Sequence, residues 1–228
     1  MSRKIFIGDV HGCAKELSEL LDKVEPDKAS DRLIFLGDLM DRGPDSYPVF
    51  SMVRDLKKEM KERCTVIRGN HDDFFLSGDE ETWGFNGRSE TIRSFLEHGK
   101  NARRHRGWFA LNTQLFYRDD EIQAVHAGLY AEDPAENEDS VLLWDREALE
   151  SGGYSHRLTM VGHTPVKFPL RSYRNENNER RLEAYEYGPA YKLPDRGLLD
   201  IDTGCVYGGR LTAAVVECGN IRFVSNRS

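Results

Sequence analysis

The chain has 228 residues, and its 32 Lys and Arg residues against 39 Asp and Glu residues give a formal net charge of −7. A hydrophobic fraction of 39% with 31% charged residues predicts a folded globular chain and excludes a disordered one. The acidic balance argues against a nucleic-acid-binding protein, and the sequence has no apolar run long enough to span a membrane. The length suits one domain, so residues 1–228 are predicted to form a single domain.

The N-terminal residues and the cysteines predict a reduced, cytoplasmic protein. Asp9 comes too early for the apolar core of a signal peptide. The four cysteines lie far apart and include no CxxC pair, so they do not resemble a small disulfide framework. We interpret Cys13 and Cys205 as small structural residues, with oxidation as the alternative.

The first third of the chain alternates strand patterns with helix patterns. Short buried strands are predicted at residues 4–10, 32–39 and 64–68. Between them, residues 13–24 and 47–63 place apolar side chains at helical spacing. This order is typical of βαβ units and predicts a parallel core.

The later strands are closer together, and turns such as residues 207–209 favour antiparallel pairing. Two polar stretches, residues 132–140 and 171–186, are predicted to be solvated loops. The whole pattern predicts a mixed α/β architecture with two packed sheets and helices outside. The later strands are predicted at residues 115–117, 122–126, 158–162, 198–202, 211–216 and 221–224.

Several of the predicted strands end in a residue that can bind a metal ion, beside a glycine that allows close approach of the backbone. In an α/β protein such strand ends are where ligands gather. Carboxylate, imidazole and amide groups together suit Mn²⁺, Fe²⁺ or Zn²⁺. Two such ions, about 3.5–4 Å apart, need a carboxylate between them. The residues of these types at the strand ends are Asp9, His11, Asp38, Asp41, Asn70, His71, Asp72, His126 and His163.

The ordered motifs GDVHG, GDLMDRG, GNHD, HAG and GHT resemble those of the calcineurin-like metallophosphoesterases, in the bacterial type of the phosphoprotein phosphatase branch. The resemblance runs from Gly8 to about Gly209 and extends to the symmetrical diadenosine tetraphosphatases. It implies a metallophosphoesterase-like β-sandwich of two mixed sheets flanked by helices, with a dinuclear metal centre at its top.

The resemblance also implies roles for the candidate ligands. Asp9 and His11 would bind the first metal ion, and Asp38 would bridge both ions. The implied cofactors are two divalent metal ions, with Mn²⁺ preferred and Fe²⁺ or Zn²⁺ as alternatives. The second ion would be bound by Asn70, His126 and His163.

Four further residues suit the chemistry of phosphoryl transfer. Arg42 and Arg146 are the candidates for binding phosphate oxygens, together with Asn70, because a guanidinium group binds two such oxygens at once. The nucleophile would be a water or hydroxide between the metal ions. His71 is the candidate general acid, and Asp41 would orient its imidazole.

The leading interpretation is a protein serine/threonine phosphatase that hydrolyses phosphoprotein by direct attack of a metal-bridging hydroxide. The alternative is a symmetrical bis(5′-nucleosyl)-tetraphosphatase. Asp72 in GNHD favours the nucleotide hydrolases, whereas GHTPV, the intact DRG motif and the compact chain favour the protein phosphatases. A phosphodiesterase or nuclease and a non-catalytic phosphate-binding module rank lower.

The expected partner is a phosphorylated protein or a small phosphorylated substrate, with no nucleic acid and no membrane. Specificity is expected to depend on three segments that the sequence pattern presents as loops, residues 74–112, 129–157 and 165–196.

Overall fold

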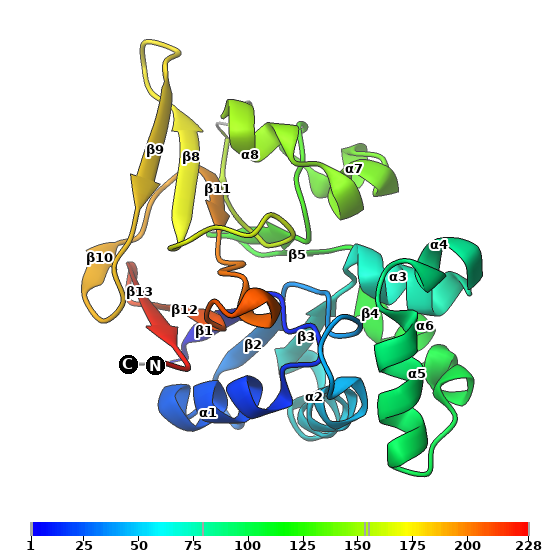
Figure 1. Ribbon diagram of the computed structural model, residues 1–228. Helices are drawn as coiled ribbons and strands as arrows, with labels where there is room; N and C mark the ends of the chain where they lie inside the picture. The colour runs from blue at the N-terminus through cyan, green and yellow to red at the C-terminus, as the bar shows by residue number, and fades with distance from the viewer. Residues whose placement is uncertain (1, 79, 153, 155, 228) are drawn as a thin grey trace.

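The computed structural model describes residues 2–78, 80–152, 154 and 156–227. Within these residues the strands form two mixed sheets, and helices lie on the outer side of each sheet (Figure 1). The predicted α/β class, with two mixed sheets flanked by helices, is therefore confirmed. None of the described helices has the length and hydrophobicity that a membrane span requires.

The first sheet has the strand order β10-β13-β12-β1-β2-β3-β4 in the described residues. β1, β2 and β3 pair in parallel, as the βαβ pattern predicts, and β12 pairs antiparallel with β1. Its strands are β1 (Lys4–Ile7), β2 (Arg32–Phe35), β3 (Cys64–Ile67), β4 (Thr113–Gln114), β10 (Ala190–Lys192), β12 (Thr212–Glu217) and β13 (Asn220–Ser225).

The second sheet has the described strand order β5-β6-β7-β11-β8-β9. β6, β7 and β11 pair in parallel, whereas β8 and β9 are antiparallel to their neighbours. Its strands are β5 (Phe116–Arg118), β6 (Gln123–Val125), β7 (Leu158–Val161), β8 (Leu170–Arg174), β9 (Arg180–Ala184) and β11 (Gly197–Asp200).

The helices fall into three groups along the chain (Figure 1). The first group covers the outer face of the first sheet, the second forms a block beside that sheet, and the third covers the second sheet. The α-helices are α1 (Ala14–Val24), α2 (Ser46–Met60), α3 (Asn70–Ser77), α4 (Glu80–Gly84), α5 (Arg88–Glu97), α6 (Arg106–Asn112), α7 (Asp139–Trp144) and α8 (Glu147–Ser151). Short 3₁₀ turns occupy η1 (Lys61–Arg63), η2 (Ala102–His105), η3 (Pro134–Glu136) and η4 (Cys205–Tyr207).

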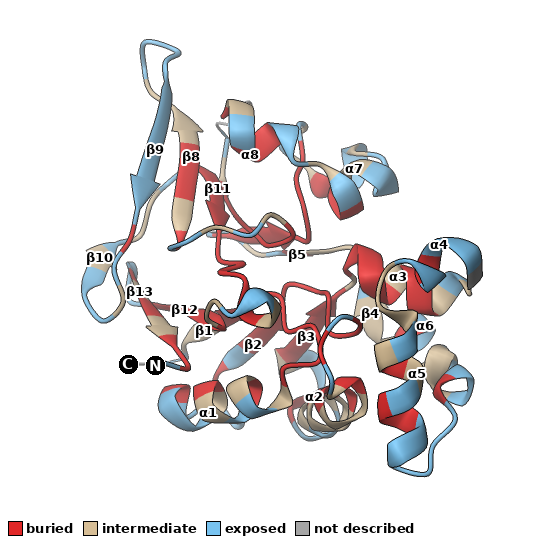
Figure 2. Ribbon diagram, in the orientation of Figure 1, coloured by how far each residue is buried: buried red, intermediate tan, exposed pale blue. Residues whose placement is uncertain are grey.

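Alternation along the buried strands explains the layered core. In β1, Ile5 and Ile7 belong to the apolar cluster beneath the helices, whereas Phe6 belongs to the cluster shared by the two sheets. Successive side chains of a strand point to opposite faces, so one strand contributes to both clusters. Figure 2 shows the resulting buried strands at the centre, with more exposed helices around them.

The prediction of a loop at residues 171–186 is wrong, because β8 and β9 form an antiparallel hairpin there. All five residues of β9 are exposed at the edge of the second sheet (Figure 2). Charged side chains on an edge strand protect it from pairing with other chains. The same charges gave this segment the composition of a loop.

Two other predicted features also differ from the structure. Residues 74–112 contain the second half of α3 and all of α4, α5 and α6, so this segment is largely helical. The turn at residues 207–209 does not join two strands of one sheet, since β11 lies in the second sheet and β12 in the first. It belongs to a connection that carries the chain from one sheet to the other.

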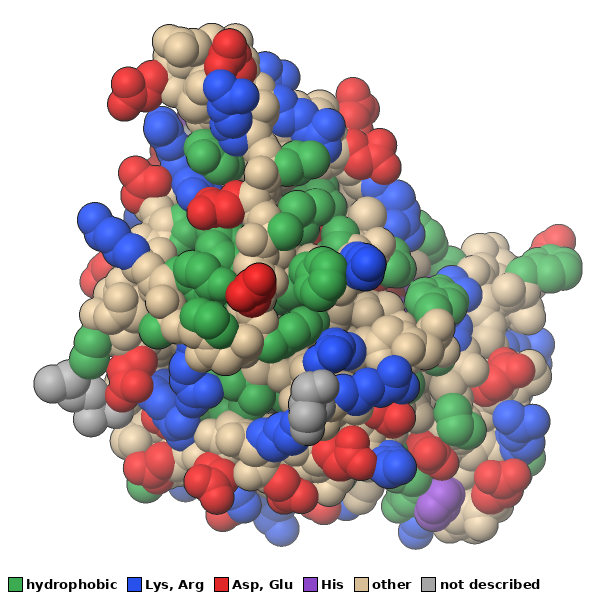
Figure 3. Space-filling view, turned by 60° about the vertical axis from the view of Figure 1, so that its left-hand side comes forward, with side chains coloured by type: hydrophobic (Ala, Val, Ile, Leu, Met, Phe, Trp, Pro, Cys, Tyr) green, Lys and Arg blue, Asp and Glu red, His purple; other side chains and the backbone are tan. Residues whose placement is uncertain are grey.

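The surface mixes charges of both signs. On the face shown in Figure 3, acidic and basic side chains are interspersed, with Lys and Arg gathered near the centre and hydrophobic side chains above them. This mixture agrees with the near balance of the two signs in the composition.

A half-buried ion pair secures the turn between β5 and β6. The Asp119 carboxylate accepts hydrogen bonds from the backbone N–H groups of Glu121 and Ile122, both at 2.9 Å, and from the Tyr117 hydroxyl at 2.6 Å. Lys4 Nζ lies 2.8 Å from Asp119 Oδ2. Burial alone would raise the pKa of Asp119, but Lys4 and the hydrogen bonds lower it to about 2.

We expect Asp119→Asn to destabilise the fold by about 1–2 kcal/mol at pH 7. Because the pKa of Asp119 is lower in the folded state than in the unfolded state, its stabilisation is complete above about pH 4 and is lost as the pH falls toward 2. In urea unfolding at pH 7, 4 and 3, the difference in unfolding free energy between wild type and variant should become smaller as the pH falls. The exposed neighbour Asp120, changed to Asn, is the control. A difference that stays constant with pH would contradict this account.

Candidate metal centre and active site

The loops that follow five strands bring the predicted ligands together. Those after β1, β2 and β3 leave the same edge of the first sheet because these strands are parallel, and those after β6 and β7 come from the second sheet. A polar cluster buried this deeply is costly unless its members are paired or bind a ligand. The buried residues are Asp9, His11, Asp38, Asn70, His126 and His163.

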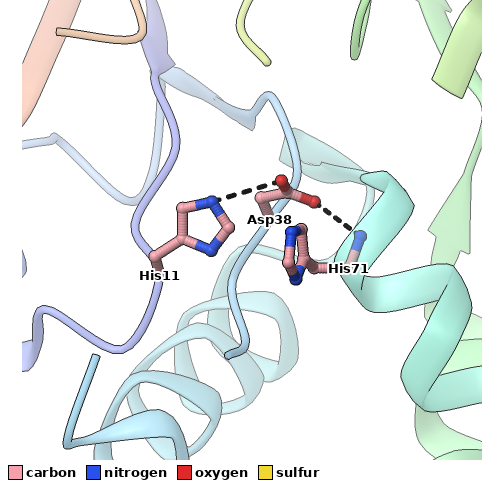
Figure 4. Close-up of side chains that lie close together, drawn as sticks. All are labelled: His11, Asp38 and His71. Atoms are coloured by element: carbon pink, nitrogen blue, oxygen red, sulfur yellow. Dashed lines mark hydrogen bonds and ion pairs between the residues drawn. The ribbon is translucent and has the colours of Figure 1, made fainter. Parts of the chain in front are cut away.

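Asp38 lies at the centre of this cluster. Its Oδ2 atom is 3.3 Å from His11 Nε2 and 3.5 Å from His126 Nε2. Its Oδ1 atom accepts a hydrogen bond of 2.9 Å from the backbone N–H of His71 (Figure 4). Two sets of potential metal ligands share this carboxylate, namely His11, Asp38 and His71, and Asp38, His126 and His163.

Backbone carbonyls orient two of the imidazoles toward Asp38. His11 Nδ1 donates to the carbonyl oxygen of Met40, and His126 Nδ1 donates to that of Leu36, each at 2.9 Å. Each Nε2 atom is thereby left facing the centre. This arrangement is typical of metal-binding histidines, in which the second ring nitrogen donates to a carbonyl or carboxylate.

Asn70 and Asp9 complete the cluster in different ways. Asn70 Oδ1 lies 3.0 Å from His126 Nε2 and 3.0 Å from His163 Nδ1, so the amide oxygen lies within the second set. Asp9 Oδ2 accepts a hydrogen bond of 3.1 Å from the backbone N–H of His163. Asp9 therefore lies beside the cluster but belongs to neither compact set.

Glycines allow the backbone to approach these carboxylates. A Cβ atom on Gly69 would lie 2.0 Å from Asp38 Oδ1, and one on Gly162 would lie 2.1 Å from Asp9 Oδ1. Neither distance is possible for real atoms, so a side chain at either position would displace a candidate ligand. The glycines of GNHD and GHT are thus required by the packing of the site.

Left-handed backbone conformations concentrate at the same place. Such conformations cost energy for residues other than glycine and cluster at functional sites. Five of the site residues adopt a positive φ, namely His11 (43°), Asp38 (49°), Asp41 (71°), Arg42 (65°) and His163 (68°).

Burial controls the charge of the imidazoles. It lowers the pKa of His11 to about 4 and that of His163 to about 3, with His126 and Arg146 adding to the shift at His163. At neutral pH both rings are uncharged, which is the form that binds metal ions. Burial also opposes charge on His126, but the Asp38 carboxylate outweighs it and raises the pKa of this ring.

The carboxylates are crowded as well as buried. Burial raises the pKa of Asp9 well above its ordinary value, and the charges of Asp202, Asp38 and Asp200 add to the shift. Burial likewise raises the pKa of Asp202 to about 6. Burial would also raise the pKa of Asp38, yet the neighbouring imidazoles lower it well below the ordinary value. A divalent cation would relieve the repulsion among these groups.

Two unpaired atoms show that the residues fit a metal ion. Within the described residues, Asp9 Oδ1 and His163 Nε2 are buried and have no hydrogen-bond partner. Unpaired buried polar atoms are costly and call for a partner. Carboxylate, imidazole and amide oxygen together suit borderline-hard divalent cations. The cluster therefore has the chemistry of a metal centre.

His71 and Asp41 form a second, adjacent unit. His71 Nδ1 donates to Asp41 Oδ2 at 3.0 Å. Asp41 is completely buried, and its carboxylate also accepts hydrogen bonds from Trp83 Nε1 at 2.9 Å and from Thr91 Oγ1 at 2.6 Å. Trp83 of α4 and Thr91 of α5 thus fix the carboxylate that orients His71. Neither residue was predicted from the sequence, because these helices have the polar composition of a loop.

Both predicted arginines reach the site. Arg42 Nη2 lies 3.1 Å from His71 Nε2. Arg146 Nη1 donates to the backbone carbonyl of His163 at 2.9 Å and to Thr164 Oγ1 at 3.2 Å. Both arginines line a cavity of about 90 Å³, which we call the catalytic cavity, together with His11, Asp38, Asn70, Asn86, His71, Trp144, His163, Pro165, Asp202 and Tyr207.

Asp72 and Asp202 also contribute to the site. No structural role was predicted for either residue from the sequence. Asp72 Oδ1 accepts a hydrogen bond of 3.0 Å from the Leu39 N–H, and its Oδ2 accepts one of 3.1 Å from the Gly69 N–H. Asp72 therefore joins the loop that carries Asp38 to the start of α3. Asp202 lines the catalytic cavity. The carboxylate-rich segment at the end of β11 was the available signal for it.

Cys13 and Cys205 lie close together in the core between the first sheet and its helices. With Glu16 they offer three potential ligand atoms within 4.8 Å of one another. Neither cysteine lines the catalytic cavity. Their burial agrees with the interpretation as small core residues.

The family described as calcineurin-like phosphoesterase matches residues 2–193. Because this match spans most of the chain, the chain belongs to the calcineurin-like phosphoesterase family. The resemblance drawn from the five motifs is thereby confirmed, and the chain is a metallophosphoesterase, a class of hydrolase.

Two curated relatives align over 92% of this chain. A symmetrical bis(5′-nucleosyl)-tetraphosphatase of Dechloromonas aromatica is 26% identical, with 91% of its length covered. Serine/threonine-protein phosphatase 1 of Salmonella typhimurium is 29% identical, with 90% of its length covered. A solved metallophosphoesterase of Sphaerobacter thermophilus has the same fold, with a TM-score of 0.67, 19% identity and coverage of 98% of this chain and 87% of that one.

Proposed function

We propose that this member of the calcineurin-like phosphoesterase family hydrolyses symmetrical dinucleoside tetraphosphates at a dinuclear metal centre. The observation that carries the proposal is the position of Asp38 between two sets of potential metal ligands, at a cavity lined by Arg42, Arg146 and His71. Such a site presents positive charge on several sides of one phosphoryl group, which is what phosphoryl transfer requires.

The two sets of residues would each hold one divalent cation. His11 and Asp38, with Asp9 beside them, would hold the first, and we assign the second to Asp38, Asn70, His126 and His163. Bound cations would supply positive charge and lower the pKa of coordinated water toward neutrality. Mn²⁺ is the cation we propose, since the mixed oxygen and nitrogen donors suit it.

The arginines would bind the phosphoryl oxygens. A guanidinium group matches two phosphate oxygens with two parallel hydrogen bonds. Arg146 is held by the carbonyl of His163 and by Thr164, so it is already oriented at the cavity wall. Arg42 donates to His71 Nε2 in this structure and would turn from that atom toward the phosphate when substrate binds.

His71 would deliver the proton to the leaving oxygen. With Nδ1 donating to Asp41, its Nε2 atom faces the cavity and becomes available once Arg42 turns away. Asp41 stabilises the protonated ring and fixes its orientation, since Trp83 and Thr91 hold the carboxylate in place. A positioned general acid of this kind contributes about 10²–10⁴-fold to the rate when the leaving oxygen is strongly basic, as it is in a phosphoserine ester.

Two observations support a dinucleoside tetraphosphate as the substrate. The relative from Dechloromonas aromatica carries that activity in its name and aligns along nearly the whole chain. Asp72, the final residue of GNHD, is the feature of the sequence that favours the nucleotide hydrolases. This proposal reverses the order of the two interpretations drawn from the sequence, where the protein phosphatase came first.

A protein serine/threonine phosphatase is the second candidate. The Salmonella relative of that name is slightly more identical, at 29%, and aligns over the same share of this chain. A phosphorylated protein would use the same metal ions, arginines and general acid. The two candidates differ in the bond that is cleaved, an ester or an anhydride, and in the group that occupies the space beyond the phosphoryl site.

The test is a comparison of kcat/KM on metal-free protein reloaded with Mn²⁺. We expect diadenosine tetraphosphate to be hydrolysed at least about tenfold more efficiently than a phosphoserine peptide, a difference of about 1.4 kcal/mol in transition-state binding. The product should be ADP, because cleavage at the central anhydride gives two identical halves. A faster reaction with the peptide would establish the second candidate instead. Hydrolysis of neither substrate would overturn the catalytic proposal.

A further inference from the structure

A second, larger cavity adjoins the catalytic cavity. It has a volume of about 400 Å³, against about 90 Å³ for the catalytic cavity, and Pro165 and Tyr207 line both. The smaller cavity has room for little more than one phosphoryl group, so the remainder of a large substrate must lie outside it. The larger cavity falls in the size range of pockets for small organic ligands. We call it the adjoining cavity.

Positive charge dominates the adjoining cavity. Its lining includes Lys167, Arg210 and Arg227 and contains no Asp or Glu among the described residues. Lys167 and Arg227 are exposed, whereas Arg210 is half-buried and stacks over Tyr187 with its Cζ atom 5.0 Å from the ring centroid. In an acidic chain this local excess of cations is suited to a ligand with several negative charges.

Two exposed aromatic rings also line the adjoining cavity. Phe168 is 42% exposed and Tyr207 is 60% exposed. Lys167 Nζ lies 5.5 Å from the Phe168 ring centroid, and Arg42 Cζ lies 5.8 Å from that of Tyr207. Tyr207 therefore stands between the arginine of the catalytic cavity and the adjoining cavity. Exposed rings beside cations are the surface on which nucleobases stack while their phosphates are bound.

The wall of the adjoining cavity is preformed. The Gly204 N–H donates to Asp202 Oδ1 at 3.0 Å, and the Gly209 N–H donates to the Gly204 carbonyl at 2.9 Å. Thr203 Oγ1 donates to the carbonyl of Arg210 at 2.7 Å. These bonds fix the connection from β11 to β12, the segment that crosses between the sheets. A fixed wall binds a ligand without the entropic cost of ordering a loop.

We propose that the adjoining cavity binds the nucleoside diphosphate that departs from a dinucleoside tetraphosphate, with the base on Phe168 and the phosphates on Lys167 and Arg227. The identity of the substrate in this statement rests on the proposed function. The affinity of the cavity for a nucleoside diphosphate does not depend on the proposed function, because binding can be measured without turnover.

The experiment measures binding of ADP and of inorganic pyrophosphate to the metal-loaded protein by calorimetry. Phe168→Ala should weaken the binding of ADP about tenfold and leave the binding of pyrophosphate unchanged, because only ADP carries a base that can stack. Lys167→Gln should weaken the binding of ADP and of pyrophosphate about tenfold, because both ligands carry two phosphate groups. Both side chains are exposed, so neither change should disturb the fold. Lys58→Gln removes a charge that is also exposed but lines a different cavity, and it is the matched control.

Hydrolysis of p-nitrophenyl phosphate separates this proposal from the proposed function. This small substrate occupies only the catalytic cavity, so its kcat/KM should be unchanged in both variants. If the chain prefers a phosphopeptide but Phe168→Ala still weakens ADP, the proposed function is wrong and the nucleotide cavity stands. If ADP binding responds to neither variant, the adjoining cavity is not a nucleotide site, whatever the chain hydrolyses. If Lys167→Gln weakens the binding of acidic peptides and leaves ADP binding unchanged, the adjoining cavity is a peptide site and the proposal of a nucleotide site is wrong.

Discussion

Replacing Asp38 by Asn is expected to lower the rate of hydrolysis about 10³-fold, a loss of about 4 kcal/mol of transition-state stabilisation. Asp38 lies 3.3 Å from His11 Nε2 and 3.5 Å from His126 Nε2, and both sets of potential ligands include it. Removing its charge should therefore weaken metal binding in both sets at once. Metal content after dialysis and kcat at saturating Mn²⁺ measure the two effects.

The fold should survive this change, because the amide that replaces the carboxylate would keep an oxygen to accept the hydrogen bond from the His71 N–H. Asp73→Asn is the matched control, since Asp73 lies in α3 near the site but pairs with Arg68. An Asp38→Asn variant that binds both ions and keeps full activity would show that this carboxylate does not bridge a dinuclear centre. Loss of only one ion would point to a ligand of a single site.

Replacing His71 by Asn is expected to lower the rate about 10²–10⁴-fold for substrates with poor leaving groups, such as phosphoserine. The loss should be much smaller for p-nitrophenyl phosphate and for diadenosine tetraphosphate, because nitrophenolate and ADP are weakly basic anions that leave without a proton. Metal affinity should be unchanged if His71 acts as the acid. The leaving-group dependence of kcat, measured with metal content, tests both points.

This prediction distinguishes two possible roles of His71, that of a general acid and that of a metal ligand. His71 lies in one set of potential metal ligands with His11 and Asp38 (Figure 4). Loss of one metal ion in His71→Asn, with equal rate losses for good and poor leaving groups, would make it a ligand and not an acid. His98→Asn is the control, since His98 is exposed and binds the backbone carbonyl of Ser94.

The candidate site could be predicted because its residues lie directly after buried strands. The strands predicted at residues 4–10 and 32–39 are recognisable from short apolar runs, although the structure ends them earlier, at Ile7 and Phe35. Parallel pairing brings their ends to one edge. Once those ends are placed together, Asp9, His11 and Asp38 must be neighbours. The glycines beside these residues predict that the backbone comes close to them. Gly69 and Gly162 confirm this, because a side chain at either position would overlap a carboxylate of the site.

The residues that surround the site could not be predicted in the same way. The helices that supply Trp83 and Thr91 lie in a polar segment whose periodicity is weak, and their hydrogen bonds to Asp41 depend on tertiary packing. The β8–β9 hairpin has the composition of a loop because β9 is an exposed edge strand. The adjoining cavity combines Lys167, Tyr207 and Arg227, which come from three separate segments and which no local pattern relates.

The measurement that tests the central claim most directly is a Mn²⁺ titration of metal-free protein with diadenosine tetraphosphate as substrate. Binding stoichiometry and ADP release would be followed in the same samples. We predict that ADP release rises with Mn²⁺ and reaches its plateau when two ions are bound per chain, and that a chelator abolishes it. Full activity with one ion bound, or hydrolysis that persists in the metal-free protein, would contradict a dinuclear centre built around Asp38.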